Sequence, residues 1–332
     1  MIDVALPGSA IPVRCDWRCG SVELADVPDP ASAGRTGAVW IDTARLPEGL
    51  RSRWTGTVGA LELLVACERP PLPAGLIFHT GQCGSTLLAN MLAAYPGLRV
   101  LSEPDVLSQL LVHQGFADQA GAEAVRLLFS AFSRGSGAGR GAVVKASNWH
   151  ALAARRILAG LPGVPAVFIW RPAAEVVASC LHQPPPWSGF RDLRALLARQ
   201  VPLLEGTDDP ATAPAELFAR LWSATVRAGL DLVRAHGDQV CVLAYDDLRA
   251  DPAAVGTDIV GRFGLHGTNA LADAMTRAAG RYSKDLTGRT AFDPCGAHAR
   301  APLNSSEHAV VTRWTAPLET EIRSLRTDRA GP

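Results

Sequence analysis

The chain is poor in lysine. It contains thirty arginines but only two lysines, Lys145 and Lys284, among 332 residues. Arginine-rich coding explains the general depletion, but it does not explain why these two lysines remain. A lysine offers a compact point charge with rotatable donors, which an arginine cannot copy. Both lysines are therefore candidate functional residues.

The chain also lacks an excess of charge and long apolar runs. Its 32 basic residues balance its 32 acidic ones, which argues against a general nucleic-acid-binding protein. No run of eighteen apolar residues occurs, so we expect no transmembrane helix. The N-terminus has no charged segment followed by an apolar one, so we expect no secretory signal and a cytoplasmic location.

Paired cysteines are scarce. The seven cysteines are an odd number in a large chain, which disfavours a disulfide framework. Cys15 and Cys19 are the one close pair, and no second pair completes a zinc site. We expect reduced thiols and no metal.

A Walker A lysine is missing from the most informative stretch, GLIFHTGQCGSTLLANML at 75–92. The apolar residues 76–78 predict a buried strand, and the spacing of Leu88, Met91, Leu92 and Tyr95 predicts a helix. The turn between them, residues 80–86, is called the anion loop below, because a glycine-containing turn at a helix N-terminus binds phosphate-like anions. Its Gly-Ser-Thr has no lysine after the glycine, unlike an ordinary nucleotidase loop. The alternative is an ordinary strand-to-helix turn.

The organisation of the chain changes near residue 72. Clusters of proline and glycine interrupt the chain at 28–34 and 68–75, and the second marks the end of an N-terminal appendage, 1–72, with short strands expected at 11–14, 21–24 and 38–41. In 73–332, strands alternate with helices, which predicts an α/β domain: a mostly parallel central sheet with helices on both faces. The expected strands are 76–79, 98–102, 142–146, 166–170 and 240–245, and the expected helices lie near 84–94, 105–115, 119–133, 149–160, 173–182, 190–203 and 212–236.

Each predicted strand ends in a residue suited to chemistry or to anion binding. The anion loop follows the first strand, Glu103 and Arg171 follow the second and the fourth, and Lys145 and Tyr245 lie at the ends of the third and the fifth. Because parallel strands place their carboxyl ends at one edge of the sheet, we expect these groups to lie together.

These ordered motifs resemble those of the sulfotransferases that use 3′-phosphoadenosine 5′-phosphosulfate (PAPS), over roughly residues 75–290. GQCGSTLLANML resembles the 5′-phosphosulfate loop of that family. The stretch from VVKAS to WRPAAEVVASC resembles its Lys-Ser-Pro segment and its 3′-phosphate segment, and AYDDL resembles its Tyr-Glu-Asp-Leu stretch. The resemblance implies the P-loop-like sulfotransferase fold.

The resemblance also implies roles for individual residues. Glu103 would be the base for an acceptor hydroxyl, and Lys145 would stabilise the transferring sulfuryl group. Arg171, with Ser179 eight residues later, would hold the 3′-phosphate. The family has Lys or Arg where Gln82 stands, which shifts the burden to the two lysines. The residues implied to bind PAPS, or its product adenosine 3′,5′-bisphosphate (PAP), are Gly81, Gln82, Cys83, Gly84, Ser85, Thr86, Arg171, Ser179, Tyr245, Ser283 and Lys284.

Alternatives remain open from the sequence alone. Glu103, which precedes Pro104, could equally cap a helix, and Tyr245 could be a core residue. The expected acceptor is a hydroxyl of a small molecule, in a reaction that needs no metal. A composition rich in arginine and alanine is typical of high-GC bacteria, where secondary-metabolite tailoring is a suitable role. We expect no nucleic-acid or membrane partner, and leave the oligomeric state open. The competing functions are an atypical P-loop kinase and a catalytically degenerate nucleotide-binding subunit.

Overall fold

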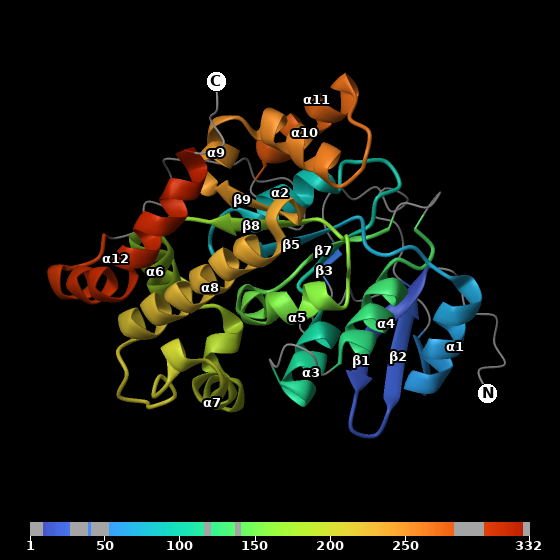
Figure 1. Ribbon diagram of the computed structural model, residues 1–332, viewed down its shortest axis with the longest axis horizontal. Helices are drawn as coiled ribbons and strands as arrows, with labels where there is room; N and C mark the ends of the chain where they lie inside the picture. Colours follow the sequence, from blue (N-terminus) through green and yellow to red (C-terminus); the bar gives the residue numbers. More distant parts are fainter. Residues whose placement is uncertain are drawn as a thin grey trace.

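The centre of the molecule is a parallel sheet (Figure 1). The computed structural model describes residues 9–26, 39–40, 53–115, 121–136, 141–281 and 302–327. Six strands form the sheet in the order β3-β6-β7-β5-β8-β9, and every neighbouring pair is parallel. The predicted fold class is confirmed. The strands are β3 (Val39–Trp40), β5 (Gly75–His79), β6 (Val100–Ser102), β7 (Val143–Lys145), β8 (Ala166–Trp170) and β9 (Val240–Ala244).

Both faces of this sheet are buried, as its apolar strands predict. Alternate side chains point to opposite faces, so Ile77 and Ile169 join one core, whereas Phe78 and Phe168 join the other. Helices α2, α10 and α11 cover the first face, and α3, α4, α5 and α8 lie on the opposite side (Figure 1). The bounds of these helices are α2 Ser85–Leu92, α3 Asp105–Gln114, α4 Ala122–Phe132, α5 Ala154–Ala159, α8 Pro214–His236, α10 Pro252–Arg262 and α11 Asn269–Ala279.

The strand order places the anion loop at a reversal of the topology. After β5, the chain forms β6 and β7 on one side of β5, and then β8 and β9 on its other side. Ligands of open α/β sheets bind beyond the carboxyl ends of the strands at such a switch point. The anion loop leaves β5 at this point, so the topology alone favours it as a binding site.

The N-terminal region forms a second, antiparallel sheet, β1-β2-β4, followed by helix α1. This sheet shares a core with the main domain, because Ile11 and Leu24 pack in the same cluster as Phe78. The third short strand expected in the appendage, β3, pairs instead with β6 of the main sheet. The boundary near residue 72 stays a prediction. The bounds are β1 Ala10–Asp16, β2 Ser21–Asp26, β4 Arg53–Thr57 and α1 Val58–Glu68.

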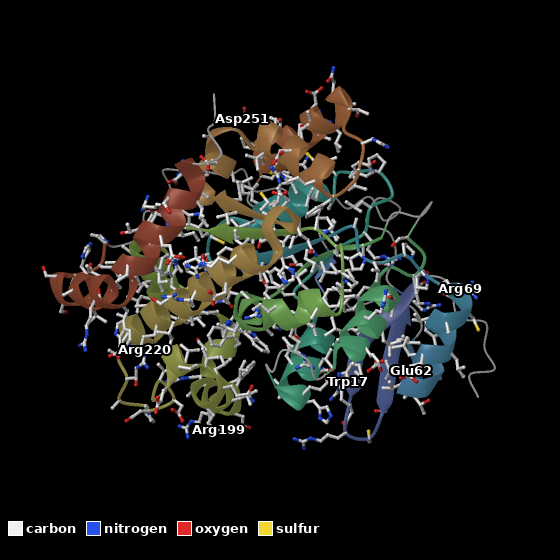
Figure 2. The ribbon with its side chains drawn as sticks, viewed as in Figure 1. Trp17, Glu62, Arg69, Arg199, Arg220 and Asp251 are labelled. Atoms are coloured by element: carbon white, nitrogen blue, oxygen red, sulfur yellow. The ribbon has the colours of Figure 1, made fainter. Side chains whose placement is uncertain are left out.

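The seven helices predicted from the pattern are present. That pattern did not give α1, α9, α10, α11 or α12 (Ser305–Thr327), whose side chains Figure 2 shows with the rest of the molecule. Helix α12 packs along α8 and α6 (Figure 1), where Ser223 Oγ donates to the carbonyl of Trp314 at 2.8 Å. No helix among the described residues is long and apolar enough to cross a membrane. Other elements that matter below are α6 (Ala173–His182), α7 (Arg191–Gln200), α9 (Tyr245–Ala250) and the short 3-10 helices η2 (Asn148–Ala153) and η3 (Pro186–Gly189).

Candidate functional site

The anion loop has the backbone of a tight cradle. Gly81, Gln82 and Gly84 have φ angles of 88°, 48° and 81°, in the left-handed region that disfavours residues with a side chain. A Cβ atom at Gly84 would lie 2.7 Å from Tyr245 Cδ2, so only glycine fits there. Helix α2 begins within the loop, at Ser85, and its first backbone N–H groups have no partner within the helix. The loop therefore presents donors suited to an anion.

Two loop amides already have partners. The N–H of Thr80 donates to the carbonyl of Ile169 at 3.1 Å. The N–H of Gly81 donates to His79 Nδ1 at 3.0 Å, so the amides that remain for an anion come later in the loop than predicted. Cys83 is fully buried and its thiol donates to the carbonyl of Ile169 at 3.4 Å. Burial raises the pKa of the Cys83 thiol, so this cysteine is a packing residue and not a reactive thiolate.

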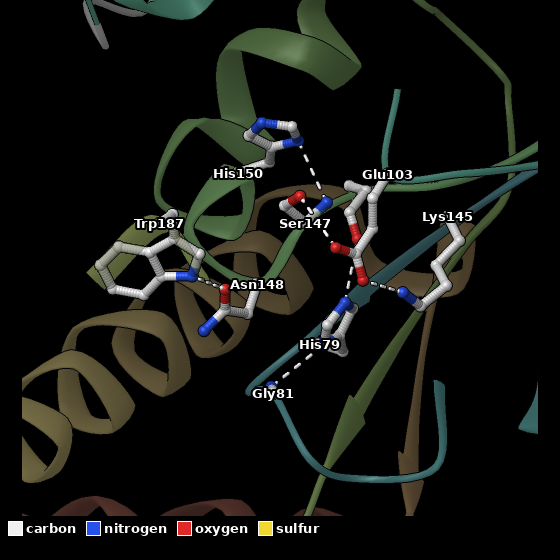
Figure 3. Close-up of polar contacts among 9 residues, drawn as sticks. His79, Gly81, Glu103, Lys145, Ser147, Asn148, His150 and Trp187 are labelled. Atoms are coloured by element: carbon white, nitrogen blue, oxygen red, sulfur yellow. Dashed lines mark hydrogen bonds and ion pairs between the residues drawn. The ribbon is translucent and has the colours of Figure 1, made fainter. Parts of the chain in front are cut away.

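Glu103 and Lys145 form an ion pair beyond the ends of β6 and β7 (Figure 3). Lys145 Nζ donates to Glu103 Oε1, Ser147 Oγ donates to the other carboxylate oxygen at 3.4 Å, and the Glu103 N–H donates to the carbonyl of Lys145 at 2.7 Å. The Lys145 side chain is 1% exposed and that of Glu103 is 31% exposed. The one lysine that the described residues contain thus lies beside the predicted base.

The ion pair controls the protonation of Glu103. Burial by itself raises the pKa of this carboxyl, but the charge of Lys145 outweighs it and lowers the pKa to about 2. Glu103 is therefore ionised at neutral pH.

The backbone at Glu103 departs from the usual preference of a residue before proline. A residue before proline is normally extended, yet Glu103 has a φ of 52°, in the left-handed region. The reason is the sharp turn from β6 into α3, in which the Glu103 N–H still bonds to β7. Pro104, not Glu103, is the N-cap residue of α3, and the Glu103 carboxylate bonds to Lys145 and Ser147. The helix-cap interpretation is therefore wrong.

Arg171 lies on the other side of the anion loop, after β8. Its Nη1 donates to the carbonyl of Gln82 at 3.2 Å, and its guanidinium carbon lies 4.5 Å from the centre of the Tyr245 ring. It also bonds to Glu175 on helix α6. Tyr245, the first residue of α9, therefore packs against both Gly84 and Arg171. The structure brings Arg171 and Tyr245 to the loop, as predicted.

The remaining predicted residues lie in helices α2 and α6 or outside the described part of the chain. Ser85 and Thr86 are buried in the first turn of α2. Ser179 lies on α6 with a side chain that is 1% exposed, and its role in binding a phosphate stays a prediction. Ser283 and Lys284 lie outside the described residues, as does Cys295. The other six cysteines are free thiols, as expected. The described residues contain no group of three or more side chains of His, Cys, Asp and Glu that could hold a metal ion.

Two residues at the site were not singled out from the sequence. Trp187 lies in a proline-rich segment, residues 182–190, that contains η3. It donates from Nε1 to Asn148 Oδ1 at 2.9 Å (Figure 3). The side chain of Asn148 lies against the loop, because a Cβ atom at Gly81 would be 3.1 Å from its Nδ2. The proline-rich segment is thus tied to the anion loop. An isolated tryptophan among three prolines was the available signal.

Comparisons with known proteins show a distant likeness. No protein-family model and no curated protein matches the chain. The solved structures that resemble it include a sulfotransferase domain of the curacin biosynthetic pathway, with 13% identity, a TM-score of 0.44, and coverage of 79% of this chain and 98% of that one. A sulfotransferase domain of the olefin synthase of Synechococcus PCC 7002 has 21% identity and a TM-score of 0.41, over 79% and 96% of the two chains. A mouse sulfotransferase complexed with PAP has 14% identity and a TM-score of 0.38, over 66% and 69%. At these values we draw no functional argument from the likeness.

Proposed function

We propose that the chain is a PAPS-dependent sulfotransferase that transfers a sulfuryl group to a hydroxyl of a small molecule. The observation that carries this proposal is the Lys145–Glu103 ion pair, which lies at the same sheet edge as an anion loop without a Walker lysine. A pairing of one cation with one carboxylate suits transfer of an anionic group to a neutral hydroxyl.

The residues present fit a donor with anionic groups. The anion loop runs into the N-terminus of α2, whose first backbone N–H groups have no partner within the helix, and Arg171 is anchored to that loop through Gln82. We propose that the loop holds the 5′ end of PAPS and that Arg171 binds its 3′-phosphate after leaving Glu175. When bound, PAPS supplies the sulfuryl group and, in its 5′-phosphate, the leaving group. Tyr245 lies against both Gly84 and Arg171, where it would contact the nucleotide.

Glu103 and Lys145 would then divide the chemistry. Glu103 takes the proton of the acceptor hydroxyl as the acceptor oxygen bonds to sulfur and the bond from sulfur to the phosphate oxygen breaks. Lys145 stabilises the negative charge on the sulfuryl oxygens and on the leaving phosphate. Trp187, held beside the loop by Asn148, would border the acceptor. We propose a cytoplasmic role in secondary-metabolite biosynthesis, either decorating a hydroxyl or converting it into a leaving group.

Calorimetric binding of nucleotides tests the donor. We expect PAP to bind the full chain, adenosine 5′-monophosphate to bind much more weakly because it lacks the 3′-phosphate, and ATP not to compete. Turnover of labelled PAPS with a panel of alcohols and phenols then tests the transfer. Preference for ATP would favour an atypical kinase. Tight binding of PAP without turnover of any acceptor would favour a catalytically degenerate subunit. The feature that suggests this alternative is Gln82, which stands where the resembling family has Lys or Arg.

A further inference from the structure

His79 uses both of its ring nitrogens inside the protein (Figure 3). The residue is 4% exposed. Its Nδ1 accepts the N–H of Gly81 at 3.0 Å, and its Nε2 lies 2.9 Å from the carbonyl oxygen of Ala146. A carbonyl can only accept, so Nε2 carries the proton and donates it, while Nδ1 keeps its lone pair. The two contacts therefore fix one neutral tautomer.

The two partners of His79 belong to the two halves of the proposed site. Gly81 opens the cradle of the anion loop, and Ala146 lies between Lys145 and Ser147, both of which bond to Glu103. The backbone bond from the Ala146 N–H to the carbonyl of Ile77, at 2.9 Å, connects β5 with the segment that leaves β7. The His79 ring adds a second connection beyond this one, where the two backbones part.

The surroundings of His79 keep it neutral. Burial, together with a smaller effect of the positive charge of Lys145, lowers its pKa to about 3 against the opposing effect of Glu103. The ring can therefore accept from Gly81 throughout the physiological pH range, and it cannot serve as the acid or base of the reaction.

We propose that His79 is a positioning residue that holds the anion loop in register with the Lys145–Glu103 pair. The inference rests on the proposed function for its catalytic consequence. Without the ring, the Gly81 amide and the Ala146 carbonyl both lose their partners, and the loop and the lysine segment are free to shift relative to each other. In-line transfer depends on such placement.

Two substitutions separate the two contacts. In His79→Asn, the amide oxygen can replace Nδ1 as acceptor for Gly81, but nothing reaches Ala146. In His79→Gln, the longer side chain can place its NH₂ near Ala146, but it then has no acceptor at the position of Nδ1, where the Gly81 N–H points. We expect His79→Gln to weaken PAP binding about tenfold, the value of one hydrogen bond of about 1.4 kcal/mol. We expect His79→Asn to keep PAP affinity within about threefold and to lower kcat about tenfold, because the lysine segment is displaced.

Ser223→Ala is the matched control. It also removes one hydrogen bond of a buried polar side chain, that to the carbonyl of Trp314, but between α8 and α12. Its melting temperature should fall by a similar amount, while its PAP affinity and kcat should stay within about twofold of wild type. If the two His79 variants change neither binding nor turnover beyond what this control shows, the histidine is only a packing residue and the inference is overturned.

Hydrogen exchange and nitrogen NMR of the protein without ligand keep the inference independent of the proposed function. The Gly81 amide should exchange slowly in wild type and in His79→Asn, and at least about tenfold faster in His79→Gln. Wild-type His79 should show the Nε2–H tautomer without titration from pH 5 to 8. If wild type does not bind PAP, the proposed function fails, and these two measurements still decide whether His79 holds the anion loop in place. A titrating His79, the other tautomer, or a Gly81 exchange rate unaffected by His79→Gln overturns it even if neither variant folds well enough for kinetics.

Discussion

An ion pair between a basic residue and a glutamate lies on each side of the anion loop, and the two pairs differ in their exposure to solvent. On the β6–β7 side, Lys145 is 1% exposed and pairs with a partly buried Glu103. On the β8–β9 side, Arg171 is 14% exposed and pairs with Glu175, which is 47% exposed. An exposed pair contributes little free energy and is screened by salt, whereas a buried pair is difficult to break.

This difference in exposure indicates that the Arg171 side is suited to binding and the Lys145 side to catalysis. A phosphate that enters from solvent can displace Glu175 from Arg171 at low cost, so this side is suited to binding and release. The Lys145–Glu103 side is preorganised and its cation is shielded from water, which strengthens electrostatic stabilisation of a transition state. We therefore expect variants on the first side to change affinity and variants on the second to change turnover.

The largest effect is expected for Glu103→Gln. The amide keeps the shape and one acceptor but cannot take a proton at neutral pH, so kcat should fall by about 10²–10⁴. PAP affinity, measured by calorimetry, should stay within about threefold, because Glu103 lies outside the nucleotide contacts. A folded variant with near-normal kcat would contradict the comparison and assign the proton to another group.

Lys145→Ala should follow closely. Loss of one stabilising charge in the transition state lowers kcat by about 10²–10³ with little change in the KM for donor. Lys145→Met retains the apolar stem and controls for packing. Lys145→Arg should recover only part of the rate, because the guanidinium fork is wider than an ammonium group. A rise in KM with unchanged kcat would show that Lys145 binds the ground state only.

Arg171→Ala should mainly weaken binding. Losing hydrogen bonds from a charged donor to a phosphate costs about 1.5–3 kcal/mol, so the Kd for PAP should rise by about 10–150-fold. The matched control is Glu175→Gln, which frees Arg171 from its carboxylate and should leave PAP binding equal or tighter. If Arg171→Ala lost affinity equally for PAP and for adenosine 5′-monophosphate, Arg171 would not be the residue that binds the 3′-phosphate.

The smallest effect is a dependence of stability on pH. Burial lowers the pKa values of His79 and His150 to about 3, below the ordinary value of about 6.5 in the unfolded chain. The unfolded state thus binds the extra protons, so their contribution is complete above pH 6.5 and is lost as pH falls toward 3. Urea unfolding between pH 6 and 5 should show a loss approaching about 2.7 kcal/mol per pH unit, and His79→Gln should halve that slope. A flat profile would show that one or both rings are charged in the native state.

Much of this arrangement could be predicted from the sequence because parallel strands impose it. Once β5, β6, β7, β8 and β9 are identified by their apolar runs, topology alone brings their following residues to one edge. The proximity of Glu103, Lys145 and Arg171 to the loop needed no further information.

Other features depend on tertiary contacts that no local pattern encodes. The left-handed backbone of Glu103 contradicts the preference of a residue before proline, and it is set by a hydrogen bond to Lys145 on another strand. The sequence predicts a short strand at 38–41, but the pairing of β3 with β6 of the main sheet is a tertiary contact that no local pattern gives. His79 has no motif of its own, and its importance lies in two partners that are distant from each other along the chain.

The ion pair between Lys145 and Glu103 also implies a sequence of events in the proposed reaction. While the ammonium group holds the carboxylate, the pKa of Glu103 is about 2 and the group is a poor base. A donor anion beside Lys145 competes for that ammonium group, and the pKa of Glu103 then rises toward its ordinary value. The acceptor hydroxyl meets an effective base only after the donor has arrived. In the proposed reaction, the donor would therefore have to be bound before the acceptor hydroxyl can lose its proton to Glu103.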